Sequence, residues 1–299
     1  MMNSRFRIVT TRDIIDFNVR EFKDGAIQVI PVCKGKEINS DDAFKHLMEK
    51  PLKDYIKLEA SIKDTQGLIA LGQIKNMIDN VQFESRHLDT LKVHCELGYM
   101  PFSRYDRSMF KNDAFSLKLV CNMINDMKFD RVIVRDPHSN VTELLLNNIV
   151  IIPQEECIMA YSFDFKSRYD AIVSPDAGAL KKIEKVAKRL DFDFTKIINC
   201  GKVRDIKTGN IIRTDVYDNV QDKKLLLVDD ICDGGRTFIQ LAKILKEKGA
   251  KSVDLYVTHG MFFYGFDVLY EEIDNIYCYY LWDDGKVESN NRLAFYKTF

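Results

Sequence analysis

Hydrophobic and polar positions alternate along the first half of the chain in a way that predicts strands and helices in turn. Apolar residues dominate 26–32 and 88–97, as is typical of buried strands. Apolar residues at helical spacing predict helices over 67–81 and 114–127, and the second leads into a strand at 131–136. This alternation favours a parallel sheet covered by helices.

The second half repeats this design. It predicts four strands and two helices, namely strands at 171–176, 196–200, 225–230 and 252–260 and helices at 179–190 and 237–249. With 299 residues, the chain is long enough for two α/β domains, which we place at 1–150 and 151–299 with a join near 147–153. The polar, charged segment 34–58 is predicted to be an insertion.

Composition narrows the class of protein. A net charge of −1 argues against a nucleic-acid-binding surface, and the absence of a long apolar run or signal-peptide core argues against a membrane partner. The seven cysteines form no CxxC pair, and several lie in apolar runs. They favour reduced, buried thiols in a cytoplasmic protein over disulfides or zinc, with Cys33 and Cys232 expected in loops.

One segment, 225–238, carries candidate chemistry. Asp229 and Asp230 end a predicted strand, and the carboxyl ends of parallel strands are where open α/β sheets bind ligands. Gly234 and Gly235 then allow a turn whose N–H groups, with the start of the next helix, suit an anion. Adjacent acids suit sugar hydroxyls or a cation, so the pattern fits a phosphorylated ribose. An ordinary strand-to-helix turn with solvated acids is the alternative.

The residues of 228–237, VDDICDGGRT, resemble the ribose-phosphate signature of type I phosphoribosyltransferases. Segments 100–107, 135–139 and 173–190 resemble the ribose-phosphate diphosphokinase (phosphoribosyl diphosphate synthetase) family, and 258–260 stands where that family carries a Thr-His pair. The resemblance implies two tandem type I phosphoribosyltransferase-like domains, each a mostly parallel sheet flanked by helices. ATP-binding segments would lie in the first and the ribose-phosphate loop in the second.

The resemblance also implies an activity and a set of functional residues. The family transfers diphosphate from ATP to the 1-hydroxyl of ribose 5-phosphate, with Mg²⁺, in nucleotide biosynthesis, and a homo-oligomer (dimer or higher) is implied. The ATP-binding positions are Phe22, Asp24, Arg104, Tyr105, Asp106, Arg107 and His138. The acceptor positions are Asp229, Asp230, Cys232, Asp233, Gly234, Gly235, Arg236 and Thr237. The metal positions are His138 and Asp176, and the catalytic positions are Lys202 and Arg204.

Arg236 departs from the family pattern, because the loop usually reads Asp-Thr-Gly-Gly-Thr and here an arginine precedes Thr237. It either covers the same phosphate from outside or makes room for two linked phosphates. The second option predicts a 5-substituted ribose such as ADP-ribose as the acceptor, in NAD metabolism. A non-catalytic partner subunit, or a phosphoribosyltransferase that consumes phosphoribosyl diphosphate, is a further alternative.

Three further groups of residues also receive a predicted role. Asp233 or His259 is a candidate to assist deprotonation of the sugar. The basic residues of 181–189 are predicted to form a solvated helix surface. The aromatic residues of 277–282 are predicted to pack in the core or at a sheet edge, with an interface as the alternative.

Overall fold

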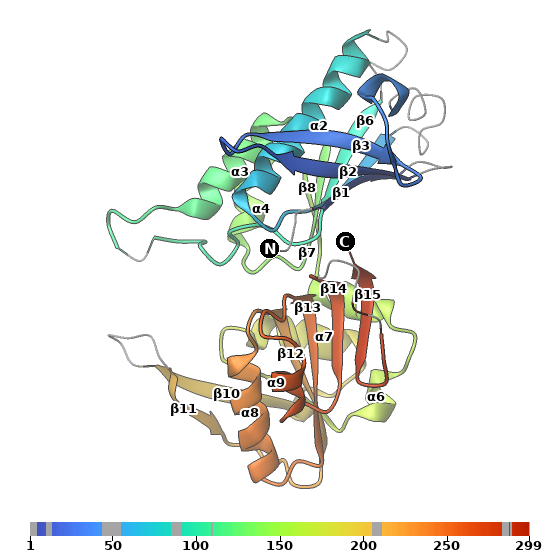
Figure 1. The fold of residues 1–299 in the computed structure, drawn as a ribbon. Coiled ribbons are helices and arrows are strands. Elements are labelled where there is room, and N and C mark those ends of the chain that lie inside the picture. Colours follow the sequence, from blue (N-terminus) through green and yellow to red (C-terminus); the bar gives the residue numbers. More distant parts are fainter. Residues whose placement is uncertain are drawn as a thin grey trace. The chain divides into compact units, whose positions relative to one another are not determined.

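The computed structural model describes residues 5–9, 14–43, 55–84, 91–108, 110–204, 211–282, 287 and 289–298, with the side chains of 202–204 and 211–214 left out. The chain divides into two compact units, with the boundary between Ile152 and Pro153. Among the described residues, no helix combines the length and the apolar character needed to cross a membrane. Each unit contains one sheet and its helices (Figure 1).

The first unit is built on a mixed sheet with the strand order β4-β3-β2-β1-β5-β6-β7-β8. Its strands are β1 (Arg5–Val9), β2 (Ile14–Glu21), β3 (Ile27–Cys33), β4 (Lys36–Glu37), β5 (Tyr55–Ser61), β6 (Lys92–Leu97), β7 (Arg131–Arg135) and β8 (Ile149–Ile152). Strands β5 to β8 are mutually parallel, whereas β1 to β4 form an antiparallel meander that joins β5 through β1. Its helices are α2 (Thr65–Glu84), α3 (Ser116–Asp126) and α4 (Val141–Leu145).

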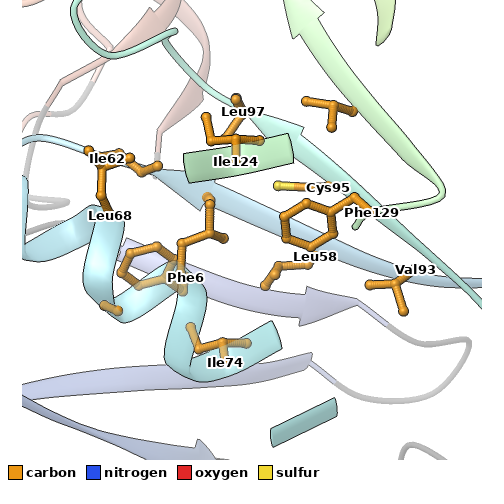
Figure 2. Packing of buried hydrophobic residues seen from close by; sticks show 14 of the residues in the cluster. Phe6, Leu58, Ile62, Leu68, Ile74, Val93, Cys95, Leu97, Ile124 and Phe129 are labelled. Carbon is orange, nitrogen blue, oxygen red and sulfur yellow. The ribbon is translucent and has the colours of Figure 1, made fainter. Parts of the chain in front are cut away.

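The core of the first unit lies between one sheet face and the helices α2 and α3. Alternate strand residues such as Phe6, Leu58 and Cys95 face inward, as the period of two along a strand requires. Ile74 of α2 and Ile124 of α3 meet them from the helices (Figure 2). This packing fixes β6 and β7, whose carboxyl ends precede residues 104–107 and His138 of the predicted nucleotide segments.

The prediction of an insertion over 34–58 is wrong where the structure describes it. Residues 36–37 form β4, and 55–58 belong to β5, which lies at the centre of the sheet between β1 and β6. The alternation of Ile56, Leu58 and Ala60 with Lys57 and Glu59 explains this placement, because it presents one apolar and one charged face. Residues 44–54 lie outside the described part.

The charged face of β5 continues across the neighbouring strands. Lys57 Nζ lies 2.8 Å from Glu59 Oε1 and 2.6 Å from Glu96 Oε2, and Arg135 Nε lies 3.3 Å from Glu96 Oε1. Burial alone would lower the pKa of Lys57, but the two glutamates outweigh it and hold that pKa above its ordinary value. Glu96 is only 2% exposed, so its charge depends on these partners.

Replacing Lys57 by methionine is therefore expected to lower the free energy of unfolding by about 2 kcal/mol or more, because the buried Glu96 carboxylate loses a cation that lies closer to it than Arg135 does. Urea denaturation followed by circular dichroism measures this change. Lys36→Met, at an exposed position in β4, is the control and should stay within about 0.5 kcal/mol of the wild type. Equal free energies of unfolding for the two variants would show that the ion pairs of Lys57 contribute nothing to stability.

The second unit is a sheet in the order β11-β10-β9-β12-β13-β14-β15, parallel throughout except for β11. Its strands are β9 (Ala171–Ser174), β10 (Ile197–Arg204), β11 (Ile211–Val216), β12 (Lys224–Cys232), β13 (Ser252–Gly260), β14 (Ile276–Leu281) and β15 (Leu293–Thr298). Its helices are α5 (Gln154–Cys157), α6 (Phe165–Arg168), α7 (Leu180–Arg189), α8 (Arg236–Glu247) and α9 (Asp267–Tyr270), with short 3₁₀ turns at Ile158–Ala160 and Phe194–Lys196.

Both faces of this sheet are covered. In β12, Leu225 and Leu227 face the cluster that includes α8, and Leu226 and Val228 face the cluster that includes α7. A strand buried on both faces reads as a continuous apolar run, which is why the sequence reveals it. The expected α/β class with a sheet and helices in each half is confirmed.

The aromatic residues of 277–282 pack inside the second unit. β14 is an interior strand between β13 and β15, and all six of its residues are buried. The ring centroid of Tyr277 lies 5.6 Å from that of Tyr161 and 5.3 Å from that of Phe163. The prediction of core packing for these aromatic residues is therefore confirmed.

Candidate functional site

The carboxyl end of β12 delivers two acids to one point of the second unit. Asp229 is half-buried and Asp230 is buried, and the Asp230 N–H donates to Asp229 Oδ1 at 2.9 Å. Gln154 Nε2 donates to the carbonyl of Asp229 at 2.6 Å and so holds the strand end. Because β9, β12 and β13 are parallel neighbours, the segments that follow them share this edge of the sheet.

Lys182 of α7 lies at this point as well. Its Nζ is 3.7 Å from Asp230 Oδ2, and the Lys182 side chain is two-thirds buried. The prediction that the basic residues of α7 form only solvated surface is wrong at this position. Lys182 precedes the buried Ile183, so its stem runs along the edge of the helix's apolar stripe and its ammonium reaches the strand end.

The loop after β12 has the shape of an anion site. Gly235 has a φ of +77° and is the N-cap of the 12-residue helix α8, so the first N–H groups of that helix are available to an anion at its positive end. A Cβ at Gly235 would lie 2.4 Å from Leu269 Cδ2, and one at Gly234 would lie 2.5 Å from Tyr264 Cε2. A side chain at either position would force its neighbour to move, and at Gly235 it would also strain the backbone.

The remaining loop residues surround this turn. Asp233 and Arg236 are exposed, and Thr237 is half-buried in the first turn of α8. The N–H groups of Phe238 and Ile239 donate to the Gly235 carbonyl at 2.9 and 3.0 Å, which closes the first helical turn. The structure thus places an exposed arginine at the first position of the helix.

The two cysteines expected in loops end strands instead. Cys33 is the last residue of β3, and Cys232 is the last residue of β12 with its thiol in the hydrophobic core. Burial, with Asp229 and Asp233 nearby, raises the pKa of the Cys232 thiol, which therefore stays neutral. Because its thiol is buried, Cys232 cannot contact the acceptor through its side chain. A contact from Cys232 to the acceptor would have to come from its backbone. All seven cysteines are free thiols.

Asp176 follows β9 and organises the start of α7. Its Oδ1 accepts hydrogen bonds from the N–H groups of Gly178 and Ala179 at 3.0 and 3.1 Å. Within the part of the chain that the structure describes, no group of three or more His, Cys, Asp or Glu side chains forms a metal cluster. Magnesium bound to nucleotide phosphates usually takes only one or two protein carboxylates, so Asp176 and the β12 acids fit such an ion.

His259 and Asp233, the two candidate bases, occupy different environments. His259 is the penultimate residue of β13, is 1% exposed and lies opposite Ile231, and its ring stacks on that of Tyr280 with centroids 5.8 Å apart. Asp233 is exposed on the loop. Of the two, Asp233 is open to a ligand from solvent.

The predicted ATP-binding segments lie at one edge of the first sheet. Residues 104–107 follow β6 and His138 follows β7, which are parallel neighbours, so these segments are adjacent. The Phe22–Asp24 hairpin joins β2 to β3 at the same edge, but β1 and β5 intervene between β2 and β6. Three strand spacings, about 14 Å, therefore separate the hairpin from residues 104–107.

The side chains of these segments are largely exposed. Arg104, Tyr105, Arg107 and His138 face solvent, and Arg107 Nε lies 3.9 Å from Asp106 Oδ1, a weak contact. In the hairpin, Phe22 is exposed and Asp24 Oδ1 accepts from the Ala26 N–H at 3.1 Å. Before His138, Asp136 is buried with a φ of +40°. Such strain in a non-glycine residue is typical of functional loops.

The two predicted catalytic residues, Lys202 and Arg204, belong to β10. Residues 197–199 of that strand pair with β9, and 200–204 continue past the end of β9 paired only with β11. Strands β10 and β11 thus form a two-stranded ribbon beyond the sheet (Figure 1). The side chains of Lys202 and Arg204 lie outside the described part, as do residues 205–210.

Comparisons with known proteins assign a class to the second-unit site. Residues 141–271 match the family model of the phosphoribosyl transferase domain, a range that contains the strand, acids and loop described above. A ribose-phosphate pyrophosphokinase of Rhizobium meliloti (strain 1021) is 34% identical over 251 residues, which cover 81% of this chain and 71% of that protein. This chain belongs to the ribose-phosphate pyrophosphokinase (diphosphokinase) family.

Other relatives match over shorter lengths. Ribose-phosphate pyrophosphokinases of Agrobacterium fabrum (strain C58) and Cereibacter sphaeroides (strain KD131) are 32% and 30% identical, over 59% and 57% of this chain. In these two comparisons the chain spans about half the length of the relatives, 56% and 51%. A crystal structure of phosphoribosylpyrophosphate synthetase from Mycobacterium smegmatis has a TM-score of 0.66 at 20% identity. The match covers 97% of this chain and 86% of the Mycobacterium smegmatis chain, which shows a common fold.

Proposed function

We propose that this protein transfers diphosphate from ATP to the 1-hydroxyl of ribose 5-phosphate, giving phosphoribosyl diphosphate and AMP. The hydroxyl oxygen forms a bond to the β-phosphorus, the bond from that phosphorus to the α,β-bridging oxygen breaks, and the hydroxyl proton leaves to solvent or a nearby base. The observation that carries the proposal is the adjacency of two acids, Asp229 and Asp230, to a glycine-capped helix start at Gly235.

The acceptor is assigned to the second unit. Asp229 and Asp230 accept hydrogen bonds from the ribose 2- and 3-hydroxyls, which charged acceptors bind more strongly than neutral ones. The N–H groups of Asp233 to Thr237 bind the 5-phosphate at the start of α8. Lys182 holds the Asp230 carboxylate in place through its ion pair and offsets negative charge beside an anionic acceptor.

The nucleotide is assigned to the first unit. Arg104 and Arg107 bind phosphate oxygens, for which the guanidinium fork is well shaped, and His138 and the hairpin at Phe22 and Asp24 complete this set. Magnesium would neutralise phosphate charge, and Asp176 of the second unit and His138 of the first are each a candidate position for it. The protein's own part is positioning and charge stabilisation, which phosphoryl-type transfer mainly requires.

Lys202 and Arg204 are assigned to the transition state. They lie on the β10–β11 ribbon, which extends past the end of β9 at the carboxyl edge of the sheet, and this position supports the assignment. Negative charge develops on the bridging oxygen as AMP leaves, and fixed cations stabilise it. These residues would therefore affect turnover more than acceptor binding.

A second candidate acceptor is a 5-substituted ribose such as ADP-ribose, with the same transfer to its terminal 1-hydroxyl. Arg236 favours it, because this exposed arginine stands at the first position of α8, where a second phosphate linked to the first would need a cation. That acceptor would link the reaction to NAD metabolism. A non-catalytic partner subunit would retain the fold without turnover.

Acceptor-dependent release of AMP from Mg-ATP tests the proposal. The purified protein is incubated with ATP and ribose 5-phosphate, with ATP and ADP-ribose, or with ATP alone, and nucleotides are separated by chromatography. AMP that appears only with an acceptor supports diphosphate transfer, and the acceptor used decides between the two candidates. ADP as the product, or no product with either acceptor, would contradict the proposed reaction.

A further inference from the structure

A short aromatic segment, Met261 to Gly265, lies directly against the loop Asp233 to Thr237, which we call the phosphate loop. It follows β13, and its backbone is fixed to the end of β12 by hydrogen bonds from the N–H groups of Met261 to the Cys232 carbonyl at 2.8 Å and of Phe263 to the Asp233 carbonyl at 3.1 Å. The segment turns through a hydrogen bond from the Gly265 N–H to the Phe262 carbonyl at 2.8 Å. Its position relative to the loop is therefore set by backbone bonds.

Phe262 anchors this turn. Its ring is 5% exposed and occupies the space where a Cβ on Gly260 would lie, 2.2 Å from Phe262 Cε2. The ring also packs against Phe266, with centroids 4.9 Å apart. Phe262 has a φ of +47°, a conformation that a bulky residue adopts only when its surroundings impose it. The turn is thus held in one conformation, and its two following side chains are directed outward.

Those two side chains, Phe263 and Tyr264, are 52% and 71% exposed. The Tyr264 ring packs so closely on Gly234 that a Cβ there would lie 2.5 Å from its Cε2. The rings of Phe263 and Trp282 form a T-shaped pair, with centroids 6.2 Å apart and an interplanar angle of 87°. A solvent-facing aromatic ring, that of Tyr264, therefore borders the loop that the proposed function assigns to the 5-phosphate.

We propose that Tyr264 determines acceptor specificity, as a stacking surface for the aromatic base of a ribose whose 5-phosphate continues into a second phosphate and a nucleoside. This inference rests on the second candidate acceptor of the proposed function, a 5-substituted ribose such as ADP-ribose. A group linked beyond that phosphate leaves the loop beside Arg236 and Tyr264, which border Gly235 and Gly234. The arginine suits the second phosphate, and the tyrosine ring suits the base.

The test measures acceptor binding by calorimetry and, in parallel, KM and kcat for AMP release. The probes are ADP-ribose and ribose 5-phosphate, and the variants are Tyr264→Ala and Tyr264→Phe. Loss of base stacking is expected to raise Kd and KM for ADP-ribose about 10-fold or more in Tyr264→Ala, with much smaller changes for ribose 5-phosphate. Tyr264→Phe keeps an aromatic ring and should restore binding to within about threefold of the wild type.

Phe194→Ala is the matched control, because Phe194 is an exposed aromatic residue before the amino end of β10, at the opposite edge of the sheet. Equal effects of Tyr264→Ala on both probes, or none on ADP-ribose, would overturn the inference. So would a change in sedimentation coefficient that accounts for the loss, since Tyr264 would then contact another protein chain. Calorimetry tests Tyr264 even if AMP release fails, and so separates this inference from the proposed reaction.

Discussion

Replacing Lys202 by alanine is expected to lower kcat for AMP release by at least about 100-fold while KM for the acceptor changes by less than about threefold. The reason is that the proposed role of Lys202 is to stabilise charge on the bridging oxygen, which develops only in the transition state. Lys202 lies on the β10–β11 ribbon, beyond the last residue of β10 paired with β9, and this position at the carboxyl edge of the sheet supports the assignment. Steady-state kinetics with Mg-ATP held saturating measure both constants.

Lys196→Ala is the matched control for this experiment. Lys196 is exposed at the other end of β10, at the amino edge of the sheet, so its loss removes the same charge without touching the ribbon. We expect the control to keep kcat within about twofold of the wild type. If Lys202→Ala also keeps kcat within a few-fold, the assignment of the ribbon to catalysis is wrong.

The second large effect is expected at Asp230. Asp230→Asn should raise KM for the acceptor about 10- to 100-fold, because an amide replaces a charged acceptor of hydroxyl hydrogen bonds, each worth about 1.5–3 kcal/mol. The same change removes the charge that forms an ion pair with Lys182. Fluorescence thermal shifts should be recorded beside the kinetics, so that lost binding is separated from lost folding.

Asp222→Asn is the matched control for Asp230→Asn, because it makes the same substitution near the opposite end of β12. Asp222 is exposed before β12 and has a φ of +59°, which asparagine tolerates. A double-mutant cycle with Lys182→Met completes the design, because the effect of removing Lys182 should shrink once Asp230 is neutral. If Lys182→Met raises KM equally in both backgrounds, Lys182 does not act through Asp230.

The parts of the fold that the sequence predicts are those buried on both sides or strongly amphipathic. Strand β12 appears as a continuous apolar run because helices cover both faces, and α2 appears through its helical spacing. Strand β5 is missed, although Ile56, Leu58 and Ala60 alternate with charged residues. Its charged face is satisfied by cross-strand ion pairs, and such pairing becomes visible only when β6 and β7 are in place.

At the candidate site, the sequence predicts the loop but not what surrounds it. The two acids and the glycines are adjacent in sequence, so a local motif reveals them. Lys182 and Tyr264 are remote from that motif, and only the packing of α7 and of the turn after β13 brings them to it. Cys232 lies within the motif, yet its side chain points into the core because β12 continues two residues further than the apolar run predicts.

The most direct test of diphosphate transfer uses ATP that carries ¹⁸O in its β- and γ-phosphoryl groups. The protein is incubated with this ATP, Mg²⁺ and each acceptor in turn. Mass spectrometry then shows where the label goes. Diphosphate transfer predicts that both labelled phosphoryl groups appear together on the acceptor and that AMP is unlabelled. Label in ADP with a singly phosphorylated acceptor, or in free phosphate, would contradict the proposed chemistry.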